Sequence, residues 1–217
     1  MDYHAEPLSK RPARQGMARG VTDGPGALEE IPLDFLAAVT AMLLERERVD
    51  AKLERLLNEA RARLGRGAVE PPHSNPGKDG NFTVATFFLF TPDGDHLDIY
   101  LPQNFPPEQA HLRIPAGHGH PGMVASTGKA RLLSDTREDR QFVQILETAR
   151  MGSAMFHPLR RDGQVIGVMV NAAIQPGTYT PADFKLHGIL ADLAALLLHS
   201  VLTTPAGRPI PARGDHA

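Results

Sequence analysis

The sequence predicts an α+β protein in which an antiparallel β-sheet is flanked by long N- and C-terminal helices. Three observations support this class. Residues 33–64 carry apolar side chains at helical spacing, residues 83–173 hold short apolar runs joined by Asp-Gly turns, and residues 181–202 are apolar on nearly every side. Turns this short join neighbouring antiparallel strands, so the hairpins indicate an antiparallel sheet.

The first helix is expected to run unbroken from Leu33 to Leu64, with an apolar stripe along its second half. Charged residues at 45–48 interrupt the stripe, so two interpretations remain open: a helix that packs along its own domain, or a coiled coil with a second copy of the chain. The second is favoured, and it predicts a parallel homodimer that Leu53→Glu would dissociate. The stripe is formed by Val49, Leu53, Leu56 and Ala60.

Five strand regions and a final helix follow. Side chains alternate along a strand, so Phe88 and Phe90 are expected on the face opposite Phe87, and Ile166 on the same face as Val168. The final helix is expected to begin after Thr180, its N-cap, and to end near Leu202. The expected strands are Thr83 to Phe90, His96 to Leu101, two short strands within 111–115 and 130–135, and a hairpin within 152–174.

This order divides the chain into four parts. Residues 1–30 are expected to be a flexible leader, 31–66 a helix, 67–203 a folded domain, and 204–217 a flexible tail. Residues 65–80, rich in Gly and Pro, are expected to form a loop or linker.

The composition excludes several functions. With 23 basic and 25 acidic residues, the charge predicts no nucleic acid and no membrane surface as a partner. The chain has no cysteine, which excludes disulfides, thiolate metal sites and cysteine nucleophiles. The N-terminus has no apolar signal segment and no run is long enough to span a membrane, so a cytoplasmic protein is expected.

One glycine motif needs explanation. Gly117, Gly119 and Gly122 have the spacing of a dinucleotide-binding loop. That site requires a buried parallel strand before it and a full crossover helix after it. Here the helix can extend only to about Thr127, because Gly128 ends it. The glycines are therefore interpreted as shaping a tight turn into a short helix.

The motifs in this order resemble the GAF domain family, whose fold is related to that of PAS sensor domains. The resemblance rests on "IPAGHGHPGMVASTGKARLLSD", "GSAMFHPLRRDGQVIGVMV" and "YTPADFKLHGILADLAALL", and it covers about residues 33–202. It implies a bacterial signal-transduction protein in which residues 67–203 form the sensor domain that binds a small molecule, and residues 31–66 form the helix for dimerisation and signalling. No output domain is recognisable, so a signal is expected to leave through a partner protein.

The chain departs from two GAF branches. GAF domains that bind cyclic nucleotides carry an N-K-x(n)-F-x(3)-D-E signature. Asn171, Tyr179 and Asp183 resemble parts of it, but Ala172 replaces the lysine and Phe184 the glutamate, so cyclic nucleotides are not expected. The branch that reduces free methionine sulfoxide uses cysteines, which this chain lacks. The resemblance therefore implies a sensor that is not an enzyme.

The ligand pocket is expected between residues 111–135 and the sheet, and it is expected to hold a small molecule. An anionic ligand would suit its histidines, which donate from both nitrogens when protonated. No metal site is predicted, and the sequence identifies no cofactor. Two alternatives remain: a GAF domain that binds haem or a diatomic gas through histidine, and a dimeric structural or adaptor module with a collapsed pocket. The candidate ligand-binding residues are Tyr100, His118, His120, Asp135, Ser153 and His157.

Overall fold

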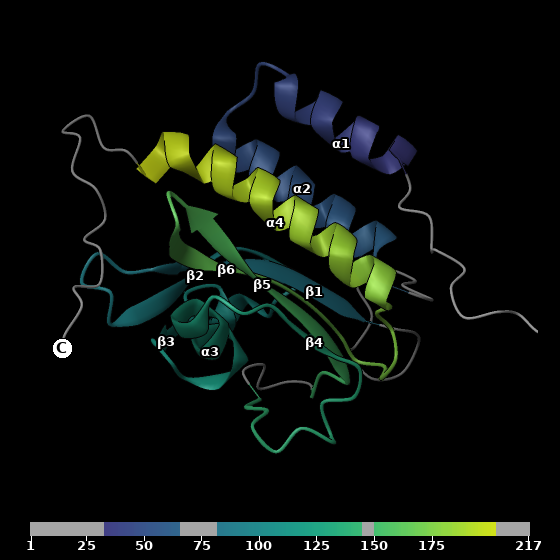
Figure 1. The fold of residues 1–217 in the computed structure, drawn as a ribbon, viewed down its shortest axis with the longest axis vertical. Coiled ribbons are helices and arrows are strands. Elements are labelled where there is room, and N and C mark those ends of the chain that lie inside the picture. The colour runs from purple at the N-terminus through teal and green to yellow at the C-terminus, as the bar shows by residue number, and fades with distance from the viewer. Residues whose placement is uncertain (1–32, 66–81, 145–149, 203–217) are drawn as a thin grey trace, which may run out of the picture.

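A computed structural model describes residues 33–65, 82–144 and 150–202. Within them, six strands form one antiparallel sheet in the order β3-β2-β1-β6-β5-β4 (Figure 1). The predicted fold class is confirmed. The strands are β1 (Thr83–Phe90), β2 (His96–Gln103), β3 (Arg113–Pro115), β4 (Arg131–Leu133), β5 (Ser153–Arg161) and β6 (Gln164–Ala173).

Helices cover both faces of this sheet. Helices α2 and α4 pack side by side on one face, α1 lies outside α2, and the short helix α3 lies on the opposite face (Figure 1). Among the described residues, no helix has the length and apolar character needed to cross a membrane. The helices are α1 (Leu33–Leu44), α2 (Val49–Arg63), α3 (Gly119–Thr127) and α4 (Pro181–Leu202), with a 3-10 turn at Pro107–Gln109.

The N-terminal region is two helices, which corrects the predicted single helix from Leu33 to Leu64. The chain turns at 45–48, and the charged residues there hold the turn together. Arg55 of α2 pairs with both Glu45 and Glu47, at 2.7 and 3.0 Å. Lys52 donates from Nζ to the carbonyl of Leu43 at the end of α1, at 2.6 Å. A cation there satisfies a carbonyl that has no partner within its own helix.

The predicted coiled-coil seam is buried inside the chain. Leu53, Leu56 and Ala60 are each 0 % exposed, and they belong to the core that α2 forms with α4 and the sheet. Side chains in this position cannot also meet a second copy. The expectation of a coiled coil through this stripe is therefore wrong, and Leu53→Glu would place a charge in the core.

The sheet separates two hydrophobic cores. Phe87 faces the core beneath α2 and α4, and Phe88 faces the core on the α3 side, which confirms the predicted alternation in β1. The prediction that Ile166 and Val168 share one face of the sheet is wrong. A β-bulge between β5 and β6 leaves Ile166 unpaired between Gly167 and Val165, so Ile166 joins the helix-side core and Val168 the other.

The glycine motif forms the predicted tight turn. Gly117 has φ +89°, and a Cβ on Gly122 would lie 2.5 Å from the carbonyl carbon of Gly117, so the turn closes only because both residues lack a side chain. Gly128 ends α3 in the left-handed conformation. At the start of α4, the Asp183 amide donates to the Thr180 hydroxyl, as expected for an N-cap. The predicted leader, almost all of the linker and the tail lie outside the described residues.

Candidate functional site

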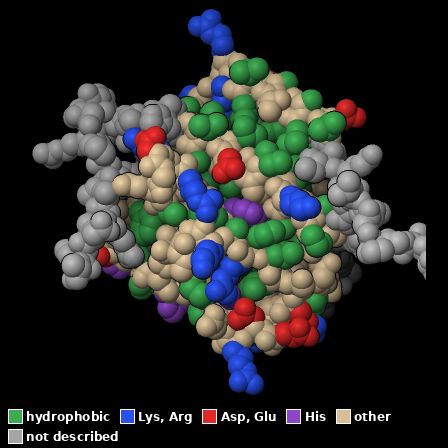
Figure 2. Space-filling model, viewed as in Figure 1, with side chains coloured by type: hydrophobic (Ala, Val, Ile, Leu, Met, Phe, Trp, Pro, Cys, Tyr) green, Lys and Arg blue, Asp and Glu red, His purple; other side chains and the backbone are tan. Residues whose placement is uncertain are grey.

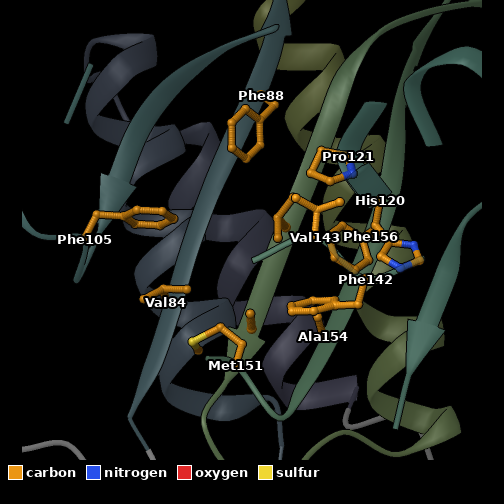
Figure 3. A pocket seen from close by; sticks show the side chains of 12 residues that line it. Val84, Phe88, Phe105, His120, Pro121, Phe142, Val143, Met151, Ala154 and Phe156 are labelled. Atoms are coloured by element: carbon orange, nitrogen blue, oxygen red, sulfur yellow. The ribbon is translucent and has the colours of Figure 1, made fainter. Parts of the chain in front are cut away.

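The candidate site is a hollow on the α3 side of the sheet. About 480 Å³ of free space lies within it and at its mouth, and part of this space is open solvent. The side chains of β1, β5 and β6 form its floor, and the start of α3 and residues 142, 143 and 151 form its walls (Figure 3). Its lining is almost entirely apolar and rich in phenylalanine: Val84, Phe88, Phe105, His120, Pro121, Phe142, Val143, Met151, Ala154, Phe156, Val170 and Ala172.

His120 is the polar side chain of this lining. It is 1 % exposed and lies beside the rings of Phe142 and Phe156, with centroid distances of 6.0 and 5.5 Å (Figure 3). Neither ring nitrogen has a hydrogen-bond partner among the described residues. The Oδ2 atom of Asp139 lies 3.5 Å from Nε2. Burial lowers the pKa of His120 although Asp139 acts in the opposite direction, so the ring is neutral near pH 7.

Two other predicted residues do not line the hollow. His118 is the exposed N-cap residue of α3, two residues before His120. The carboxylate of Asp135 accepts a hydrogen bond from Arg137 Nε at 2.9 Å, and this pairing lowers its pKa to about 2. The predicted place of both residues in the pocket lining is wrong.

The remaining three predicted residues face the helices on the other side of the sheet. Tyr100 donates its hydroxyl to Asp50 of α2 at 2.6 Å. Ser153 donates to the carbonyl of Gln175 at 2.9 Å. His157 lies 2.8 Å from His187 of α4, between their Nδ1 atoms. The structure therefore does not bring these residues together with His120.

The reason for this separation is the register of the strands. Tyr100 pairs with Phe87, Phe87 with Met169, and Met169 with His157, so all four side chains share the helix face. The pocket takes the alternate residues of the same strands, such as Ala154 and Phe156. A shift of one residue along a strand exchanges the two faces of the sheet. The polar residues Ser153 and His157 of β5 were predicted to line the pocket, but they lie on the helix face.

The sequence analysis did not identify the aromatic lining or Asp139. Phe88, Phe142 and Phe156 come from three separate segments, and only the folded sheet brings them together. Asp139 belongs to an acidic and basic stretch at 135–140 that is typical of a solvated loop. No local pattern distinguishes it from its exposed neighbours.

A family model described as "GAF domain" matches residues 78–199, more than half of the chain. This range includes the whole sheet, the pocket and most of α4. The chain belongs to the GAF domain family. GAF domains are small-molecule-binding domains of sensor and regulatory proteins, so the family and the apolar hollow agree. No curated protein matches the chain.

Solved structures show the same fold at low identity. The chain is similar to the GAF domain of an Acinetobacter phosphoenolpyruvate-protein phosphotransferase, with 14 % identity, a TM-score of 0.63, and coverage of 78 % of this chain and 93 % of that one. It is also similar to a free methionine-R-sulfoxide reductase of Neisseria meningitidis solved with its substrate, with 20 % identity, a TM-score of 0.58, and coverage of 76 % and 86 %. It is similar as well to the reduced form of fRMsr of Staphylococcus aureus, with 20 % identity, a TM-score of 0.56, and coverage of 78 % of this chain and 97 % of that one.

These neighbours correct one expectation. The chain was expected not to be an enzyme, but GAF-fold reductases are among the structures that it resembles. A GAF fold therefore does not by itself indicate a protein without catalytic activity. At these identities the likeness concerns the fold and gives the chain no substrate.

Haem and metal ions fit the described site poorly. The twelve lining residues include no Lys or Arg that could pair with haem propionates. His118 is exposed, so the two histidines of the motif do not converge. Within the described ranges, no group of three or more His, Asp or Glu side chains is placed to hold a metal ion.

Proposed function

We propose that this GAF domain is a sensor that binds a small, mostly apolar molecule in the hollow beside α3. One observation carries the proposal: His120 is buried at the wall of an apolar hollow, and its Nδ1 has no partner in the described structure, while its Nε2 has Asp139 Oδ2 at 3.5 Å without a well-formed hydrogen bond. A buried polar group without a partner costs about 1–3 kcal/mol, so a ligand that bonds to it recovers free energy. Apolar pockets with few polar groups are typical of small-molecule sites.

The sheet offers a route by which binding would reach the helices. Strands β5 and β6 present Ala154 and Ala172 to the hollow, and they present Asn171 and His157 to α4. A ligand that moves these strands would also move the contacts of α4. We propose that α4 and the N-terminal helices pass this change to an output partner.

The contact with a second copy or a partner is proposed on the outer helices. Leu33 and Leu44 of α1 are 74 % and 86 % exposed, and Leu196 of α4 is 72 % exposed. In Figure 2, hydrophobic side chains gather over the upper part of the molecule, where Figure 1 shows α1 and α4. Exposed leucines gathered on one side of a molecule are typical of an interaction surface.

Light scattering tests the homodimer. The native protein should have about twice the chain mass at micromolar concentration, and the double variant Leu44→Glu/Leu196→Glu should be monomeric with unchanged circular dichroism. A monomeric native protein would contradict a homodimer and leave the outer helices to a different partner.

Ligand binding is tested by a thermal-shift screen of apolar, anionic and aromatic small molecules, followed by calorimetry. A ligand at ten times its dissociation constant should raise the melting temperature by about 3–6 °C. Ala172→Leu fills the hollow and should abolish the shift. Ala37→Leu makes the same change on the exposed face of α1 and should preserve it.

Two results would contradict the sensor. One is a screen in which no compound raises the melting temperature, which would favour the structural or adaptor module. The other is a binder whose thermal shift is the same in Ala172→Leu as in the native protein, because it would bind elsewhere.

A further inference from the structure

The chemistry around His120 restricts what the hollow can bind. The ring is neutral, and one nitrogen of a neutral imidazole carries a hydrogen while the other accepts a hydrogen bond. Asp139 Oδ2 lies 3.5 Å from Nε2 and can only accept, so the hydrogen is expected on Nε2. Nδ1 is then left as an acceptor without a partner among the described residues.

The same surroundings disfavour anions. The Asp139 carboxylate lies beside the ring, and the lining holds no Lys or Arg. An anion that entered the hollow would lose its hydration and would lie near a like charge, and both effects oppose binding. The anionic ligand suggested by the histidines of the sequence therefore does not fit the pocket that the structure forms.

The shape and lining favour a flat ligand. Four phenylalanine rings line the hollow, and two of them, Phe142 and Phe156, lie beside the imidazole with ring planes tilted 32° from it (Figure 3). Aromatic rings pack favourably against one another in offset or edge-to-face arrangements. A small aromatic molecule can make these contacts while a polar substituent reaches His120.

We propose that the hollow selects small neutral aromatic molecules that carry a hydrogen-bond donor, a hydroxyl or an N–H, and that His120 accepts this hydrogen bond while Asp139 orients the ring. This inference rests on the proposed function, because it names the ligand class of the same pocket. It makes His120 a residue that determines specificity, and the phenylalanines the source of most of the affinity.

The test uses four probes of similar size: phenol, anisole, toluene and benzoate. Binding to the native protein is measured by calorimetry or methyl NMR at millimolar concentration. Phenol should bind about five- to tenfold more tightly than anisole and toluene, as expected for one hydrogen bond to an otherwise unpartnered group. Benzoate should bind more weakly than toluene.

Two variants assign the preference. His120→Leu should bind toluene about as well as the native protein does, and its ratio of phenol to toluene affinity should fall to about one. Asp139→Asn keeps His120, but its amide can donate to Nε2 and move the ring hydrogen to Nδ1, so the preference for phenol over anisole should decrease. If His120→Leu does not fold, the native ratio and the Asp139→Asn ratio decide the test.

The outcomes separate the inference from the function on which it rests. Equal affinities for phenol, anisole and toluene, or tighter binding of benzoate, would overturn the inference and leave a ligand pocket in place. A phenol preference that persists in His120→Leu would overturn the role of His120. No binding of these probes or of any compound in the thermal-shift screen would overturn the proposed function itself.

Discussion

His157 and His187 meet between the sheet and α4, with 2.8 Å between their Nδ1 atoms. His187 is fully buried, and its Nε2 lies 3.1 Å from Asn171 Oδ1 on β6. The Asn171 oxygen accepts from His187 Nε2, so His187 Nδ1 is the acceptor and His157 Nδ1 is the donor. These two hydrogen bonds link β5, α4 and β6, and they require both histidines to be neutral.

Acid should destabilise this contact. Burial lowers the pKa of His157 to about 4 and that of His187 well below its usual value. Between those values and about 6.5, the unfolded chain binds more protons than the folded one. Stability should therefore be at its full value above pH 6.5 and decrease as the pH falls toward 4. Urea unfolding across this range measures the decrease.

A matched variant separates this effect from the titration of carboxylates. His157→Gln should make the free energy of unfolding less dependent on pH in that window, whereas His111→Gln, at an exposed position, should leave the pH dependence unchanged. An equal pH dependence in the native protein and in His157→Gln would contradict the assignment.

Leu53 should act as a core residue of the monomer. It is 0 % exposed between α2, α4 and the sheet, so Leu53→Ala should lower the free energy of unfolding by about 2–5 kcal/mol. Glu54→Ala, at an exposed position of the same helix, should change it by less than about 0.5 kcal/mol. Denaturant unfolding gives both values. A Leu53→Ala protein of native stability that had lost only its self-association would restore the coiled-coil interpretation.

Tyr100 should stabilise the contact between the sheet and α2. Its hydroxyl donates to Asp50 at 2.6 Å, and burial, followed by this bond, raises the pKa of Tyr100. Tyr100→Phe should lower the free energy of unfolding by about 1–2 kcal/mol. Adding Asp50→Asn to the Tyr100→Phe protein should lower it no further, because the hydrogen bond is already lost. Tyr179→Phe is the control, because the buried Tyr179 hydroxyl has no hydrogen-bond partner within the described structure and its loss should be neutral or stabilising. Equal costs for the two tyrosine variants would contradict this assignment.

Gly122 should be required for the turn that supports His120. An added Cβ would lie 2.5–2.8 Å from backbone atoms of Gly117, so Gly122→Ala must displace α3 or the turn before it. The expected cost is about 1–3 kcal/mol, together with weaker ligand binding. Ser126→Ala, at an exposed position of the same helix, should have neither effect. Unchanged melting and binding in Gly122→Ala would show that the turn does not support the pocket.

The secondary structure of the sheet and α4 could be predicted because its signals are local. Asp-Gly turns joined apolar runs into hairpins, Thr180 marked the start of α4, and Gly128 marked the end of α3. The break between α1 and α2 was missed because its cause is not local: Glu45 and Glu47 close the turn by pairing with Arg55, ten and eight residues further on.

The site was predicted less well because it depends on register. A shift of one residue along a strand moves every side chain to the other face of the sheet. The bulge at Ile166 introduces such a shift in β6, and the prediction for β5 was wrong by the same one residue. Polar residues of β5 attracted the prediction, yet Ser153 and His157 bond to the chain itself on the helix side. Of the histidines in the turn, the structure brings His120 to the hollow and leaves His118 exposed.

Methyl NMR of labelled methionines would show whether a small molecule occupies the hollow beside α3. Met151 lines the hollow, whereas Met155 and Met169 are buried on the opposite face of the same sheet. Titration with phenol, and with every compound that raises the melting temperature, should shift the Met151 methyl resonance first and most strongly. Ligands that shift Met155 or Met169 and leave Met151 unchanged, or a Met151 resonance that no compound moves, would contradict the proposed ligand site.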